Sequence, residues 1–241
     1  MMLLAAIHLV LAMTSSDALV TVLNSPSASG AKTFAAAKAI VEREAAQGKP
    51  LQQFVVGVTT DDKELAKKYL SASSDRIRTL AAQKDNPLAW YLLSMEKNDL
   101  RLLRRAANLG NVQALNALGT ISTQEAMKNA HDGDTNNLEK VLSTCFGYFS
   151  RAAEQRDPNG FINLGACYLR GLGCKQDMEL AFQCFRSAAE LGHPEGMDNI
   201  SAMYQFGHGV KPDAELSLFW AMRGRAARGD EAAAKWLRDR K

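Results

Sequence analysis

Long apolar runs are missing from this 241-residue chain, and none approaches the roughly 20 residues that a membrane span needs. Alternating runs rich in Val, Ile and Thr are nearly absent as well, which disfavours a β-sheet protein. The cysteines show neither a Cys-x2-Cys pair nor a Cys/His zinc spacing. What remains is an alanine-rich chain, 46% hydrophobic and 23% charged, which is typical of a helical globular protein.

Recognisable catalytic and ligand-binding patterns are also lacking. The four histidines are scattered, and no Ser/His/Asp or Cys/His arrangement or carboxylate pair is visible. GLGCKQD, Gly171 to Asp177, holds glycines beside a lysine but lacks the G-x-x-x-x-G-K-[ST] spacing of a phosphate loop. His131 to Asn137 resembles the start of an EF-hand, yet Asn137 replaces the required glycine and Ser143 the required glutamate. We therefore predict no catalytic residue, no metal site and no cofactor.

An internal repeat is the strongest pattern in the sequence. YLRGLGCKQD, Tyr168 to Asp177, returns as YQFGHGVKPD, Tyr204 to Asp213, 36 residues further on. One unit is predicted as a helix, a turn at Gly171 and Gly173, and a second helix whose N-cap is Asp177. Copies of the stretch before this turn begin at Leu80, Arg105, Arg151 and Ser187.

The second helix of the unit carries one apolar stripe, so a single hairpin cannot bury both of its faces. Stacked hairpins bury a continuous core instead. The predicted fold class is therefore all-α: an α/α superhelix, or solenoid, of stacked antiparallel helical hairpins. The stripe consists of Leu180, Ala181, Cys184, Phe185, Ala188 and Ala189.

These residues resemble the Sel-one-like repeat (SLR) family, which is related to the tetratricopeptide repeats. The resemblance implies a curved superhelix that binds other proteins as an adaptor, and it names no ligand. One copy matches the family pattern at Gly160, Leu164, Gly165, Tyr168, Gly171, Gly173, Asp177, Ala181, Phe185, Ala188, Ala189 and Gly192. The next copy matches at Tyr204, Gly207, Gly209, Val210, Asp213 and Trp220.

The chain divides into three predicted regions: 1–30 is an apolar segment with a linker, 31–79 a degenerate helical region, and 80–241 the repeats with a capping helix. The apolar run Leu3 to Met13 has the length of a signal peptide, but no Lys or Arg precedes it. A cleaved signal peptide and an N-terminal helix both stay open. The localisation is correspondingly either cytoplasmic, or secreted and endoplasmic-reticulum lumenal.

The predicted function is a non-enzymatic scaffold that binds a protein or peptide on the concave face formed by the first helices of the hairpins. Asn116, Asn163 and Asn199 are the candidate partner-binding residues, because repeated amides suit recognition of an extended peptide backbone. Two alternatives remain: an adaptor in endoplasmic-reticulum quality control, and a hydrolase of the β-lactamase-like kind assigned to some repeat relatives.

Two further features have a structural and a functional interpretation. Residues 223–241 hold seven Lys/Arg against three acids, and we interpret them as the solvated face of a terminal helix instead of a nucleic-acid site. Cys167 and Cys184 fall on the two facing helices of one hairpin. A disulfide between them is possible, but buried free thiols are favoured.

Overall fold

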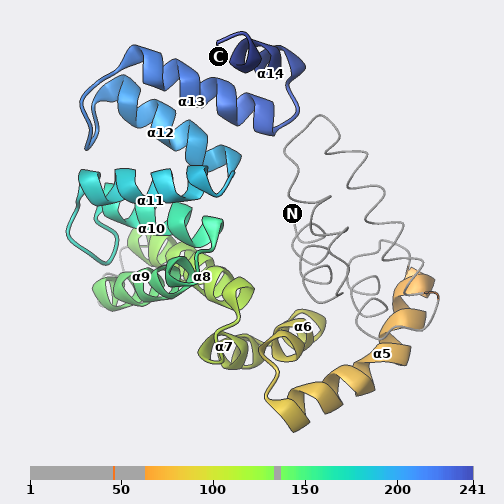
Figure 1. Cartoon of the computed structure of the whole chain (residues 1–241). Coiled ribbons are helices and arrows are strands. Elements are labelled where there is room, and N and C mark those ends of the chain that lie inside the picture. The colour runs from red at the N-terminus through yellow and green to blue at the C-terminus, as the bar shows by residue number, and fades with distance from the viewer. Residues whose placement is uncertain (1–45, 47–62, 133–136, 241) are drawn as a thin grey trace. The chain divides into compact units, whose positions relative to one another are not determined.

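The computed structural model describes residue 46 and residues 63–132 and 137–240 (Figure 1). The predicted 1–30 segment, most of the 31–79 region and the centre of the EF-hand-like loop lie outside these residues. The chain forms two compact units, one ending at Ala114 and the other running from Leu115 to Lys241. Each unit is described by itself. In the described ranges, no helix combines the length and apolar character that crossing a bilayer takes.

The first unit contains α5 (Lys63–Lys84), α6 (Pro87–Lys97) and α7 (Leu100–Asn108), which pack in sequence order. Asn86 begins α6 because its side-chain oxygen accepts hydrogen bonds from the N–H groups of Leu88 (3.0 Å) and Ala89 (3.1 Å). The link between α6 and α7 is tight and lacks the glycine turn of the later hairpins. The core of this unit includes Ile77, Ala81, Leu92, Leu93, Leu103 and Ala106.

The second unit is a stack of antiparallel hairpins, which confirms the predicted all-α solenoid. Consecutive helices from α9 to α14 contact one another, and α10 also contacts α12, the first helix of the next hairpin (Figure 1). α8 begins before the unit boundary and is longer than α10 and α12, the first helices of the following hairpins. The helices are α8 (Val112–His131), α9 (Leu138–Glu154), α10 (Pro158–Arg170), α11 (Met178–Glu190), α12 (Pro194–Phe206), α13 (Ala214–Ala227) and α14 (Glu231–Arg238).

The glycine turn has the predicted role. Gly171 ends α10 with φ of 68°, and Gly173 has φ of 72°, a conformation that side chains disfavour. Asp177 caps α11 by accepting a hydrogen bond from the N–H of Leu180 at 2.9 Å. A Cβ on Gly173 would lie only 2.1 Å from the carbonyl oxygen of Leu142 in α9. The turn therefore rests directly on the preceding hairpin.

The same junction is built twice, 36 residues apart. Gly209 approaches the Met178 carbonyl as closely as Gly173 approaches that of Leu142. Aromatic rings also pack edge to face at both junctions, with centroids 5.4 Å apart and planes at 86°. The two ring pairs are Phe146–Tyr168 between α9 and α10 and Phe182–Tyr204 between α11 and α12.

Candidate interaction face

The first helices of the hairpins carry a recurring set of side chains, and within each helix these side chains are spaced as neighbours on the helix surface. Each position on α10 recurs on α12 after 36 residues and has an equivalent on α8, 46 residues earlier. The side chains are half-buried or exposed, so the stripe faces away from the core. We name this stripe the first-helix face; it consists of Ala117, Thr120, Gln124, Asn163, Ala166, Arg170, Asn199, Ala202 and Phe206.

Asn163 and Asn199 lie at the centre of this face, at equivalent positions on α10 and α12. Both side chains are half-buried, and within the described ranges neither makes a hydrogen bond. Each amide offers two N–H donors and one carbonyl acceptor. Two such amides in register can pair with the N–H and C=O groups of an extended chain that crosses both helices.

Asn116 occupies a different position from the other two predicted asparagines. Its Nδ2 donates to Asp157 Oδ2 at 2.7 Å, and Asp157 in turn caps α10 by accepting from the N–H of Gly160. The repeat spacing makes Asn116 equivalent to Ile162 and Asp198, one residue away from the asparagine position. The structure therefore places Asn116 against the turn that precedes α10, with one donor already used.

The chemical character of the face varies along its length. Ala166 and Ala202 follow the two asparagines by three residues and leave room for close approach of a peptide backbone. Phe206, at the end of α12, is 63% exposed, and its ring lies 5.8 Å from that of His208. Arg170 is the exposed equivalent on α10. The face thus combines amides, small side chains, one cation and one exposed aromatic ring.

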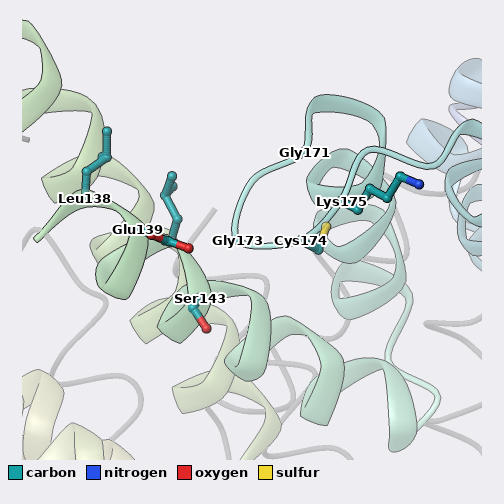
Figure 2. A pocket seen from close by; sticks show the side chains of 8 residues that line it. Leu138, Glu139, Ser143, Gly171, Gly173, Cys174 and Lys175 are labelled. Atoms are coloured by element: carbon teal, nitrogen blue, oxygen red, sulfur yellow. The ribbon is translucent and has the colours of Figure 1, made fainter.

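A shallow hollow of about 560 Å³ lies between the start of α9 and the glycine turn. Figure 2 shows Glu139 and Ser143 on the α9 side, while Lys175 points away from α9. The N–H groups of Gly171 and Leu172 donate to the Cys167 carbonyl, and the N–H of Asp177 donates to the Tyr168 carbonyl. These three backbone N–H groups are hydrogen-bonded within the turn, which supports a structural role for the turn instead of a phosphate loop.

The model of the Sel1 repeat family matches residues 100–111, 113–157, 162–193 and 194–221. The chain belongs to the Sel1 repeat family. Members of this family commonly serve as protein–protein interaction scaffolds. The matched residues include the glycine turns, the caps Asp157 and Asp177, and the first-helix face described above.

Two solved structures are similar to this Sel1 repeat chain. A Sel1 repeat protein from Oxalobacter formigenes is 24% identical, with a TM-score of 0.44, over 53% of this chain and 90% of the other. A protective antigen with an SLR fold, present in uropathogenic Escherichia coli strains, is 20% identical, with a TM-score of 0.37. That match covers 84% of this chain and 53% of the antigen. No curated protein matches the chain.

The four cysteines of the Sel1 repeats are free thiols that share one apolar cluster. Cys145 and Cys167 are buried, whereas Cys174 and Cys184 are half-buried. The thiol that interacts with Cys167 belongs to Cys145 of α9, and not to Cys184 as the hairpin topology suggested. Across the described residues, no group of three or more His, Cys, Asp or Glu side chains is arranged to hold a metal ion.

The cations of the C-terminal repeat are largely engaged in contacts within the protein. Arg240 bonds to Glu215 at 3.0 Å and lies 4.5 Å from the centre of the Trp236 ring. Arg225 pairs with Asp230, and Arg228 pairs with Asp198. These contacts agree with the interpretation of the basic segment as the surface of a terminal helix. They are exposed, so each contributes little to stability. The sequence pattern indicated the excess of charge but not its partners.

Proposed function

We propose that this Sel1 repeat protein is a non-enzymatic scaffold that binds an extended segment of a partner protein on its first-helix face. The observation that carries the proposal is the pair of asparagines, Asn163 and Asn199, at equivalent positions on two adjacent helices. Their amides have no hydrogen-bond partner within the described ranges, although both side chains are half-buried. Amide groups that have no partner within the protein are available to hydrogen-bond the backbone of a bound segment.

The surrounding residues support a peptide over a small molecule as the occupant. The described part of the face is a stripe across successive helices, and the hollow beside the glycine turn lies apart from the asparagines. A peptide laid across α10 and α12 would meet Ala166 and Ala202, which offer no steric barrier. An apolar side chain of the peptide would find the exposed ring of Phe206. Hydrogen bonds to the peptide main chain would supply affinity, and the Phe206 ring would favour peptides that carry an apolar side chain at this point.

The experiment compares a double variant, Asn163→Ala/Asn199→Ala, with the wild-type protein and with Gln183→Ala. Gln183→Ala is the matched control because it removes an exposed amide from α11, the second helix of the hairpin. Twelve-residue peptides are selected from a displayed library on the wild-type protein, and their Kd values are measured by fluorescence polarisation. Circular dichroism and melting curves first establish that all three proteins fold alike.

We expect the double variant to weaken binding by at least tenfold, because each lost amide removes up to two hydrogen bonds to the peptide backbone. Gln183→Ala is expected to bind like the wild type. Equal affinity of the double variant for every selected peptide would exclude the asparagines as the binding residues. Asn116, whose Nδ2 is bonded to Asp157, stays a prediction as a third contact. A single Asn116→Ala variant in the same assay tests it.

A further inference from the structure

The two buried cysteines lie on opposite sides of a junction between hairpins. Cys145 is on α9 with 0% of its surface exposed, and Cys167 is on α10 with 2% exposed. Both belong to the apolar cluster that holds these two helices together. The junction therefore places two thiols on neighbouring helices, 22 residues apart in the sequence.

The next junction shows that packing alone does not require two thiols. Thirty-six residues further on, Ala181 and Met203 occupy the same two positions, and both are buried. The two junctions share the ring pair and the glycine contact described above. An alanine and a methionine therefore suit this backbone arrangement. The two cysteines bring a reactivity that the alternative pair does not have.

The two thiols have unequal acidity. Hydrogen bonding with the Cys167 thiol lowers the pKa of Cys145 to about 6, while the same interaction and burial raise the pKa of Cys167. Cys145, whose thiol also donates to the Leu142 carbonyl at 3.0 Å, is thus the more acidic thiol of the pair, and the thiolate is the nucleophilic form. Burial raises the pKa of Cys184 to about 11, and burial also raises the pKa of Cys174. Those two cysteines are weaker nucleophiles.

We propose that Cys145 and Cys167 form a disulfide when the protein meets a peroxide, and so join α9 covalently to α10. The Cys145 sulfur attacks one oxygen of hydrogen peroxide, the O–O bond breaks, and hydroxide leaves and takes up a proton to become water. The Cys167 sulfur then attacks the resulting sulfenic acid, the S–O bond breaks, and a second water leaves. Two thiols and one peroxide thus give one disulfide and two waters.

The reagent must reach a buried pair, and its size matters. Hydrogen peroxide is little larger than water, so a small local opening of the junction is enough for it to reach Cys145, the thiol that attacks first. Cys174 stands in that turn, and its thiol lies 3.6 Å from the Cys167 carbonyl oxygen. Cys174 is the strongest competitor for the sulfenic acid, so any experiment must distinguish its links from the proposed one.

The test uses the full chain. The protein is treated with hydrogen peroxide and then with catalase, its remaining thiols are alkylated in denaturant, and its peptides are mapped by mass spectrometry without reduction. We expect a loss of two free thiols and one linked pair, Cys145–Cys167, that dithiothreitol reverses. Closing a loop of 22 residues should raise Tm by roughly 5–10 °C, again reversibly.

Cys145→Ala/Cys167→Met is the matched control, because it copies the Ala181 and Met203 pair of the next junction. This variant should fold like the wild type, keep both remaining thiols under peroxide, and show no reversible shift in Tm. A link through Cys174 or Cys184, four intact thiols, or Cys145 oxidised to sulfinic acid without a link would each overturn the proposal. None of these outcomes depends on whether the first-helix face binds a peptide.

Discussion

The hairpins α10–α11 and α12–α13 have the same turn and the same length of first helix, but they differ where their two helices cross. In the first hairpin, Gly165 lies against the ring of Phe185, and an added Cβ would stand 2.8 Å from it. In the second, Ser201 replaces the glycine, and its hydroxyl donates to the Ser217 carbonyl at 2.8 Å. The Ser217 hydroxyl returns a bond to the Ser201 carbonyl at 2.9 Å.

The two second helices also differ in what they bury. α11 buries four apolar residues, including Phe185, whereas Gly224 is the only residue that is buried in α13. The positive φ of the turn glycines and the close glycine contact between hairpins nevertheless recur in both copies. The comparison teaches that the repeats are held in register at their turns and at the junctions between hairpins. The crossing of the two helices within a hairpin can be made either by apolar packing or by side-chain hydrogen bonds.

The largest expected effect comes from the glycines that both hairpins share. Gly173→Ala and Gly209→Ala would each place a Cβ 2.1 Å from a backbone carbonyl, at φ of 72° and 66°. We expect each to lower the free energy of unfolding by about 3–5 kcal/mol, from the clash and the disfavoured backbone together. Urea denaturation measures this loss.

Gly192→Ala is the matched control, because its φ is 86° but nothing lies within 4 Å of the added carbon. Its cost should be limited to about 1–2 kcal/mol from the backbone. A loss at only one of Gly173 and Gly209 would show that the two junctions are not equivalent.

Substitutions at the helix crossings of the two hairpins should have intermediate effects on the free energy of unfolding. Gly165→Ala should cost about 1–2 kcal/mol, because the buried Phe185 ring must move, although alanine favours the helix. Phe185→Leu in the same chain should recover part of that loss by giving the methyl group room. Ser201→Ala should cost about 1 kcal/mol by removing one hydroxyl from a reciprocal pair. Thermal and urea unfolding of the single and double variants give the coupling energy; additive losses at Gly165 and Phe185 would contradict the crossing described.

The smallest effect concerns the residues that begin the two first helices. Asp157 caps α10 through the N–H of Gly160, whereas His193 begins α12 without a side-chain cap. Burial lowers the pKa of His193 below its ordinary 6.5; Glu195 and Asp157 act in the opposite direction, and Arg228 adds to the lowering. Below about pH 6.5 the unfolded chain therefore binds more protons than the folded chain, and the free energy of unfolding decreases as the pH falls.

His193→Asp should remove this histidine-dependent loss and gain roughly 0.5–1 kcal/mol near neutral pH by capping α12 as Asp157 caps α10. The measurement is urea denaturation of both proteins between pH 5 and pH 8. His193→Asn is the uncharged control: it caps without a titrating group. Parallel pH profiles for the wild type and both variants would show that His193 does not titrate in this window.

The sequence alone predicts the features that depend on local chemistry. Positive φ at Gly171 and Gly173 and the cap at Asp177 follow from residue type and spacing, and the structure confirms them. The partner of Cys167 could not be predicted in this way, because the hairpin topology points to its own second helix and the actual neighbour, Cys145, lies on the preceding hairpin. The repeat itself could have indicated this neighbour, because it aligns Cys145 with Ala181 of the buried apolar stripe.

The asparagines illustrate a second limit of prediction from the sequence alone. A shift of one residue on a helix rotates a side chain by about 100°, so Asn116 and Asn163 occupy different positions despite their similar surroundings in the sequence. Aligning the repeats at Gly119 and Gly165 reveals the shift. The hydrogen bond from Asn116 to Asp157 lies across two hairpins and has no local signature.

The contact between Gly173 and the Leu142 carbonyl also governs how the length of such a chain can change. An insertion between Gly171 and Asp177 would push the turn into α9, whereas copying or deleting a complete 36-residue unit preserves every such contact. Growth of the array by duplication of whole units is therefore structurally permitted, and growth by lengthening this turn is not. A designer who wishes to extend or shorten the protein should cut at equivalent positions of two units.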